Sequence, residues 1–182
     1  KALAYYCSNR EKCLQEVCKI FIDGFTESNR DLAKHLYIQV MYGGDSKFWI
    51  NEQKQEGLIK ADTNSVPENV LKLQTELKDI SIRFQEINPD MKSDIKTFRE
   101  KQNKVDNFDG AFLSYYAQEW ERRLLECVYS MLKTDYIRDN DCVLCFDGIM
   151  IHKKNHNIKN ILKKCQAIVH AHFGFDLRFV EK

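Results

Sequence analysis

The segment SVPENVLKLQTELKDISIRFQEI, residues 65–87, most constrains the fold. Its apolar residues recur in steps of three and four, the period of an α-helix that buries one face. They are Val70, Leu73, Leu77, Ile80, Phe84 and Ile87. Ser65 and Glu68 have the spacing of a capping box, which predicts the start of this helix. A helix with such an apolar stripe should pack antiparallel against another helix.

Most of the preceding chain is also helical in pattern. Residues 1–25 read as one helix that Gly24 can end, and Thr26, Ser28 or Asn29 can cap the next one. That next helix covers the stretch RDLAKHLYIQVMYGG, residues 30–44. Residues 46–69 are polar, are broken by Gly57 and Pro67, and predict a loop with one short helical piece.

A long helix is predicted over residues 111–136, after a charged and interrupted stretch at 88–110. Apolar residues cover most of its circumference, so it should be buried on several sides.

The pattern changes at residue 141. Two short apolar runs flank Asp147-Gly148, a dipeptide that favours a tight β-hairpin with a carboxylate at its tip. Residues 157–172 follow as an amphipathic helix, Gly174 as its stop, and residues 175–180 as a closing strand. We therefore expect an α+β fold: a mainly helical region over 1–106, then a region over 107–182 with part of an antiparallel sheet.

Composition restricts the functional classes. The 28 Lys and Arg against 27 Asp and Glu leave a net charge of +1, so nucleic-acid binding would depend on local patches. Seven cysteines without the spacing of a disulfide framework predict reduced thiols in an intracellular compartment. No apolar run reaches 18 residues, so no membrane contact is expected. Because Lys1 lies in a helical pattern with no initiator Met, we expect a fragment of a longer protein.

Arg30, Lys34, Ile38 and Tyr42 form a stripe along the helix that contains them. At four-residue steps they share one face and cover about 18 Å of axis, roughly the reach of an extended nucleoside triphosphate. Arg30 can donate two hydrogen bonds to phosphate oxygens, and Lys34 can add a positive charge one turn later. Gly43 then permits close approach of a backbone or a base pair. Alternatively, Arg30 and Lys34 are ordinary solvated positions and Tyr42 is core.

The pattern RxxxKxxxxxxxYG, present as Arg30, Lys34, Tyr42 and Gly43, resembles the fingers-helix motif of family A (Pol I-like) DNA polymerases. RDLAK, YGG and the following Asp-x-Lys look closest to phage and virus-like members. The hairpin VLCFDGIMI resembles the second carboxylate motif of the same family's palm. The resemblance implies a fingers-like region over 1–106 and a C-terminal palm region over 107–182.

This resemblance also implies roles for matching residues. Arg30 and Lys34 would hold the triphosphate of an incoming dNTP during nucleotidyl transfer to a primer 3′ end, and Tyr42 would stack beside the nascent base pair. Asp147 would bind catalytic Mg²⁺ in a two-metal mechanism. Gln118, before the hairpin, would reach the minor groove of primer-template DNA.

Three departures from the family pattern affect these expectations. Ile38 stands where the family has Phe or Tyr, and Phe146 and Gly148 replace the His and Glu that flank the catalytic Asp. The first carboxylate motif has no counterpart before Arg30. The chain should therefore need the missing N-terminal part of the same polypeptide, which could also include primase or helicase domains, and should not polymerise alone. If the chain is viral, its compartment would be the cytoplasm or nucleus of a host cell.

Two other functional classes compete with a polymerase part. One is a catalytically inactive, polymerase-like module that binds DNA or acts as a scaffold in a larger replication protein; the loss of Glu at position 148 favours it. The other is an unrelated interaction domain that docks through residues 70–87.

Other chemistry-bearing residues have simpler interpretations. Cys142 and Cys145 form a CxxC, but i, i+3 residues in a strand face opposite sides, so buried thiols are favoured over zinc or redox use. The histidines are expected at the surface; they are His152, His156, His170 and His172. The basic run at 152–164 fits either a phosphate backbone or a solvated helix face. Four aromatic residues could stack on bases but fit a core better: Trp49, Tyr115, Tyr116 and Trp120.

Overall fold

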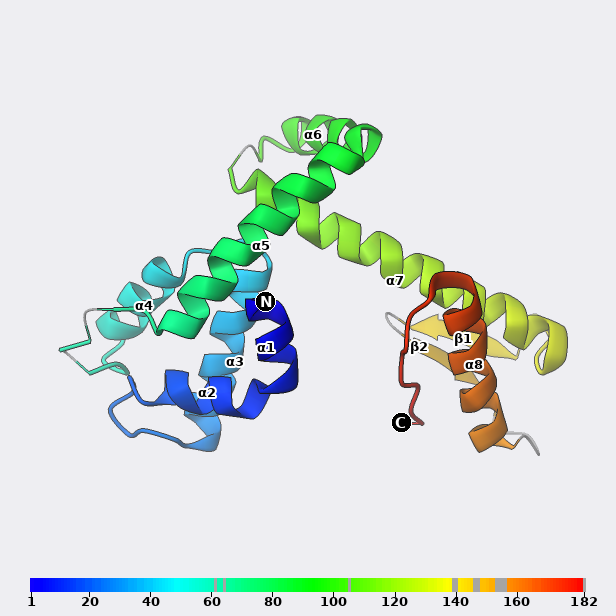
Figure 1. Cartoon of the computed structure of the whole chain (residues 1–182), viewed down its shortest axis with the longest axis horizontal. Helices are drawn as coiled ribbons and strands as arrows, with labels where there is room; N and C mark the ends of the chain where they lie inside the picture. The colour runs from blue at the N-terminus through cyan, green and yellow to red at the C-terminus, as the bar shows by residue number, and fades with distance from the viewer. Residues whose placement is uncertain are drawn as a thin grey trace. The chain divides into compact units, whose positions relative to one another are not determined.

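The computed structural model describes residues 1–60, 62–63, 65–104, 106–138, 141–145, 148–152 and 157–181. The chain divides into two compact units, Lys1–Tyr115 and Tyr116–Lys182. The first is built from helices, and the second combines helices with a two-stranded antiparallel sheet (Figure 1). The expected α+β, mainly helical fold is confirmed. The boundary between the units falls within a helix, whereas the division expected from the sequence is at 106/107. No described helix is long and apolar enough to cross a membrane.

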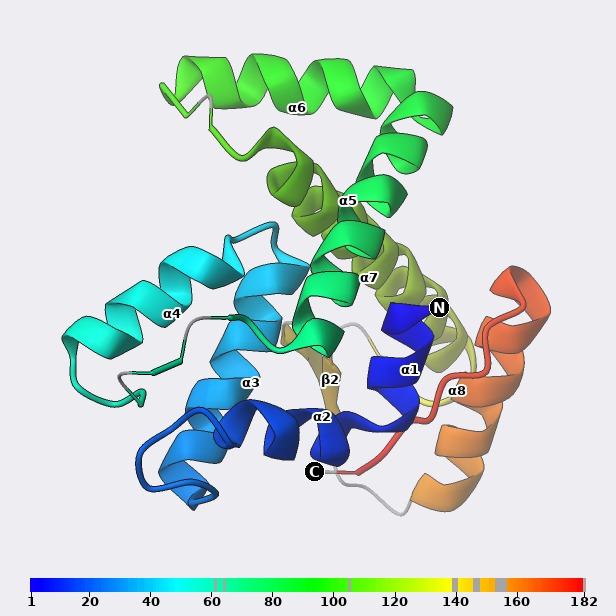
Figure 2. The same cartoon turned by 60° about the vertical axis from the view of Figure 1, so that its left-hand side comes forward.

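The first unit is organised around one central helix, α5. Its helices are α1 (Ala2–Ser8), α2 (Arg10–Cys18), α3 (Glu27–Met41), α4 (Ser46–Gln55), α5 (Glu68–Ile87), α6 (Pro89–Lys101) and the start of α7 (Phe108–Asp135). Helix α5 contacts α1, α3 and α4, and Figure 2 shows it crossing between them. Val70 and Leu73 on α5 are almost completely buried in the core of this unit. The apolar face proposed for docking is therefore used inside the unit.

The predicted first helix over residues 1–25 is wrong in two respects: two helices occupy its place, and the second ends at Cys18 rather than at Gly24. The break lies at Asn9, which has φ −131° and ψ 32°. Its side-chain amide donates to the Tyr5 carbonyl at 3.1 Å. An asparagine side chain that bonds the local backbone competes with the helical hydrogen bonds, which explains the interruption. Helix α4 matches the short helical piece expected within 46–69.

The predicted start and inner face of α5 also need correction. Pro67 is the N-cap and no side chain caps the helix, so the capping box is wrong; Glu68 instead pairs with Lys72 at 2.8 Å. In the second half, buried Ser81 donates to the Asp109 carbonyl at 2.8 Å, while Ile87 is 69% exposed. The second half of α5 therefore packs against the first turn of α7 through a polar contact and not through the predicted apolar stripe.

The second unit contains the rest of α7, the hairpin β1 (Cys142–Cys145) and β2 (Gly148–Ile151), and α8 (Ile158–Phe173). The ladder runs from Cys142 opposite Ile151 to Cys145 opposite Gly148. Gly148 is therefore a strand residue and not the turn residue that the Asp-Gly prediction made it. The core of this unit joins α7 and α8 with the inner face of the hairpin. Gly174, with φ 70°, ends α8 as expected.

Two predictions for this part of the chain are wrong. Residues 175–180 form no strand, because a strand needs a ladder partner and β1 and β2 pair only with each other among the described residues. Helix α7 is not buried on several sides: its buried side chains are Phe112, Val128 and Leu132. Its exposed surface instead carries ion pairs between arginines and glutamates within the helix.

Candidate functional site

Helix α3 is held in a fixed rotation by its buried face. The Tyr37 ring stacks on Tyr6 with centroids 4.3 Å apart, and its hydroxyl accepts a hydrogen bond from the Asn69 side chain at 2.8 Å. Thr26 caps the helix by accepting from the Asn29 amide at 3.1 Å. Contacts with α1 and α5 therefore determine which side of α3 faces solvent.

The predicted stripe lies on the side of α3 that faces away from the core. Arg30 and Lys34 are half-buried at its border, Ile38 is 40% exposed, and Tyr42 is 53% exposed. The interpretation of Tyr42 as a core residue is therefore wrong. Each four-residue step turns the stripe by about 40°, so it runs from the border of the buried face at Arg30 to the solvent side at Ile38 and Tyr42.

Arg30 is engaged in a two-point ion pair that the sequence analysis missed. Its Nη2 and Nε atoms donate to the Glu11 carboxylate on α2 at 2.6 and 3.0 Å. These hydrogen bonds lower the pKa of Glu11 below its usual value. Nothing in the local spacing signals this contact, because 19 residues separate the partners. A phosphate bound by Arg30 would have to displace Glu11 or bind through Nη1, which lies 4.0 Å from the carboxylates of both Glu27 and Asp31.

Lys34 differs from Arg30 in having no acidic partner among the described residues. It lies one helical turn further along α3, about 6 Å along the axis. The two cations of the stripe therefore differ: Arg30 is already paired with a carboxylate, whereas the ammonium group of Lys34 can bind an anion directly.

Tyr42 and Gly43 form a tightly built helix end. Tyr42 is the C-cap, and the Gly43 and Gly44 amides donate back to the carbonyls of Val40 and Gln39 at 3.0 and 2.8 Å. This is the Schellman pattern, which places a left-handed residue after the cap; Gly43 has φ 74°.

Helix α7 begins directly against this end of α3. A Cβ atom on Gly43 would lie 2.5 Å from the Gly110 Cα, and one on Gly110 would lie 2.1 Å from the Tyr42 carbonyl oxygen. The Asn107 side chain donates to that carbonyl at 3.1 Å and accepts from the Gly110 amide at 3.3 Å. The close approach expected at Gly43 is thus made by the backbone of α7, and it fixes the position of Tyr42.

The other two predicted site residues belong to the second half of the chain and not to the unit that carries this surface. Asp147 lies outside the described residues, and so does Phe146. Gln118 is exposed on α7 in the second unit. A groove with Asp147 on its floor opposite Lys34 stays a prediction.

The described residues do not form a metal centre. No cluster of three or more His, Cys, Asp or Glu side chains among them could hold a metal ion. Cys142 and Cys145 are both half-buried and free of disulfides. Gly148 has no side-chain carboxylate, so in the sequence of the hairpin only Asp147 has one. The described chain does not by itself fit a two-metal site, and a second carboxylate would have to come from elsewhere.

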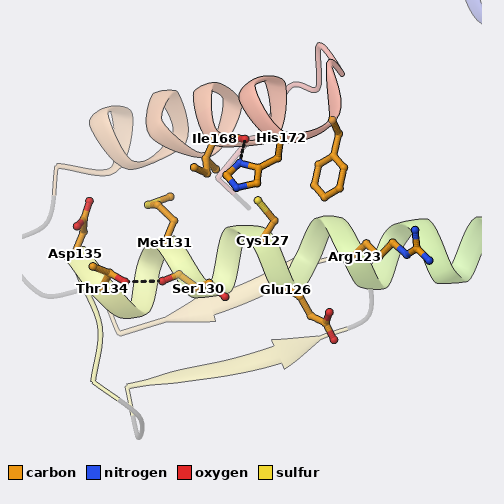
Figure 3. Close-up of a pocket in the computed structure, with 10 residues that line it drawn as sticks. Arg123, Glu126, Cys127, Ser130, Met131, Thr134, Asp135, Ile168 and His172 are labelled. Atoms are coloured by element: carbon orange, nitrogen blue, oxygen red, sulfur yellow. Dashed lines mark hydrogen bonds between the residues drawn. The ribbon is translucent and has the colours of Figure 1, made fainter.

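A cavity of about 610 Å³ lies between α7 and α8, lined by residues such as Cys127, Met131 and His172 (Figure 3). Cys127 and His172 both face this space, but the pair is poorly suited to nucleophilic catalysis. Burial raises the pKa of Cys127, which favours the unreactive thiol. The His172 Nδ1 is 3.0 Å from the Ile168 carbonyl, which makes it the ring nitrogen that carries the proton.

The aromatic residues divide between core and surface. Trp49 is 4% exposed and meets Phe21 edge to face, so it is a core residue as expected. Tyr115 is half-buried and meets Phe98 edge to face. Tyr116 and Trp120 are half-buried in the second unit.

Comparison with known proteins gives one distant relative. A Sputnik virophage protein named "Putative helicase V13" is 28% identical over 181 residues, which cover 97% of this chain and 21% of that protein. The chain thus spans about a fifth of the length of this curated relative. No family model and no solved structure matches the chain.

Proposed function

We propose that this chain is the fingers-like and C-terminal palm part of a template-directed DNA polymerase within a larger viral replication protein. In this proposal Arg30 and Lys34 bind the triphosphate of a dNTP, with Ile38 and Tyr42 beside its sugar and base, while Gly43 packs against Gly110 of α7 and holds the helix end in place. Gln118 contacts primer-template DNA, and Asp147 supplies one Mg²⁺ ligand. The second carboxylate belongs to a part of the polypeptide upstream of Lys1.

The surface of α3 carries this proposal. A helix of an ordinary bundle gains stability by burying Ile and Tyr, yet α3 leaves Ile38 and Tyr42 exposed in line with Arg30 and Lys34. The helix end at Tyr42 is also fixed from both sides, by its Schellman pattern and by Asn107. A row of two half-buried cations followed by an exposed tyrosine on a fixed helix end suits a phosphate-sugar-base ligand.

The distant relative is consistent with one part of the proposal, that the chain belongs to a larger viral replication protein. Its name describes a helicase from a virophage, and it is about five times as long as this chain. A polymerase part and a helicase part in one polypeptide match the partner domains that the resemblance implies.

Binding of Mg²⁺-dATP to the chain, measured by titration calorimetry, tests the nucleotide site. We expect Lys34→Ala to weaken binding at least about tenfold, because a charge-assisted hydrogen bond to phosphate is lost. Lys92→Ala on α6, an exposed lysine of the same unit, is the matched control and should leave affinity unchanged. Equal losses in both variants, or no binding by the parent chain, would contradict the proposal.

The second candidate is a catalytically inactive, polymerase-like module that binds DNA or acts as a scaffold. The closed Arg30–Glu11 pair and the absence of a side-chain carboxylate at Gly148 favour it. It predicts that the chain binds primer-template DNA with an affinity insensitive to Lys34→Ala and does not bind dATP, so the same titrations distinguish the two candidates.

A further inference from the structure

The outer face of α8 carries a stripe of positive charge. No Asp or Glu occurs between residues 158 and 173. At 100° per residue, Lys159, Lys163 and His170 fall within a sector of about 40°. The opposite side of the helix is buried through Ile161 and Val169. The basic stripe, Lys159 and Lys163, is therefore fixed toward solvent by packing of the apolar side.

The two lysines of the basic stripe are available to a ligand. Lys164, on another side of the helix, is already held by Asp135 at 3.0 Å. His170 contacts Asp176 at 2.9 Å. Lys159 and Lys163, by contrast, are exposed and have no acidic partner in the described part of the chain. They lie one turn, about 6 Å, apart along the axis.

An aromatic shelf, formed by Trp120, Phe173 and Phe175, lies at the C-terminal end of α8. Phe175 stands 5.4 Å from Trp120 and 6.2 Å from Phe173 between ring centroids. Its side chain is 38% exposed, and the Arg123 guanidinium lies 5.5 Å from the centre of the Trp120 ring. The cavity between α7 and α8 adjoins the shelf, since Arg123 and Phe173 also line it (Figure 3).

We propose that the basic stripe and the aromatic shelf together bind a single strand of nucleic acid. The phosphate backbone follows Lys159 and Lys163 along α8, and an unpaired base stacks on Phe175. Positive charge together with an exposed aromatic ring is the combination that single-strand binding uses, because every base offers a π-face. Here the exposed ring is Phe175, since Trp120 and Phe173 are half-buried. This site does not depend on dNTP binding by α3.

Other polyanions fit this surface less well. A basic amphipathic helix can also lie on an anionic membrane, but it does so by inserting its apolar face. That face of α8 is buried in the protein through Ile161, Cys165 and Val169. An acidic peptide would satisfy the lysines but leave the shelf without a partner.

Fluorescence anisotropy of a labelled short oligo(dT) with the whole chain, over a series of salt concentrations, tests the proposal. We expect Lys159→Gln/Lys163→Gln to reduce the slope of log K against log[salt] by about 1.4, because each phosphate contact to a single strand contributes about 0.7. The matched control is Lys92→Gln/Lys96→Gln, two exposed lysines at the same spacing on α6, which should keep the parent slope.

A second pair of variants tests the shelf. Phe175→Ala should weaken binding about fivefold, as expected for loss of one base-aromatic stack. Phe25→Ala, an exposed phenylalanine of the first unit, should leave binding unchanged. The proposal would be overturned if a variant and its control had equal effects, or if the chain bound a duplex of the same length as tightly as the single strand. It would also be overturned if poly-glutamate displaced the labelled oligo(dT) as well as unlabelled oligo(dT) does. Far-UV circular dichroism verifies that the variants are folded.

Discussion

Replacing Gly110 with alanine tests the contact that fixes Tyr42. Gly110 lies in the first turn of α7, where helix propensity alone predicts that alanine stabilises the protein by about 1 kcal/mol. The structure predicts the opposite sign. The new Cβ would stand 2.1 Å from the Tyr42 carbonyl oxygen and 2.6 Å from its carbonyl carbon. Neither atom can rotate away, because both belong to the backbone.

The size of the effect follows from these distances. Relief of the overlap requires α7 to move away from α3 by more than about 1 Å, which also strains the Asn107 hydrogen bond to Tyr42. Overpacking of this kind costs up to about 3 kcal/mol. After subtraction of the propensity gain, we expect Gly110→Ala to destabilise the first unit by about 2 kcal/mol. The unfolding midpoint should fall by roughly 5–10 °C.

Thermal unfolding followed by circular dichroism measures this change. Gly148→Ala is the matched control, since its Cβ would meet nothing closer than the Cys145 carbonyl oxygen at 3.6 Å, an ordinary contact. It should change stability by less than about 0.5 kcal/mol. An unchanged or raised midpoint for Gly110→Ala would refute the close approach of α3 and α7.

Three further predictions concern charge and titration. Glu11→Gln should strengthen Mg²⁺-dATP binding by up to about fivefold in calorimetric titrations, because Arg30 loses a competing partner; weaker binding would show that Glu11 orients Arg30 for the nucleotide. Two arginines hold the pKa of Glu119 at about 2, so its stabilising contribution is present above pH 4.5 and lost as the pH falls toward 2. The difference in unfolding midpoint between the parent and Glu119→Gln should shrink over that range, and a constant difference would contradict the assignment. Burial raises the pKa of Cys165 to about 11, so its contribution is full below pH 9 and lost as the pH rises toward 11. Protein stability, measured against Cys165→Ala, should decline over that alkaline range; a flat profile would disagree.

Periodicity predicts which elements exist better than it predicts where they begin and end. The apolar steps over residues 70–77 correctly identified α5, because three consecutive turns meet the same core. Its capping box failed because Pro67, rather than Ser65, is the residue at the N-cap. The break at Asn9 depends on a single side-chain hydrogen bond, which leaves no periodic signal.

For the site as well, local spacing predicts the positions along one helix but not the contacts with distant segments. The four-residue spacing predicts a stripe that turns by about 40° per step, and in the structure Arg30 and Lys34 lie at the border of the buried face while Tyr42 is exposed at the helix end. The partners of that surface come from distant segments: Glu11 precedes Arg30 by 19 residues, and Asn107 follows Tyr42 by 65. A single sequence indicates that Gly43 needs room, but not that Gly110 is the residue that occupies it.

Template-directed primer extension with Mg²⁺ tests the central claim most directly. The assay uses the longer polypeptide in which this chain is joined to its upstream segment, and compares the parent with Lys34→Ala, Asp147→Ala and the control Lys92→Ala. The proposal predicts extension by the parent and the control and its loss in the Lys34 and Asp147 variants. Absence of extension by the parent, with primer-template binding intact and insensitive to Asp147→Ala, would contradict a polymerase and support the inactive DNA-binding module.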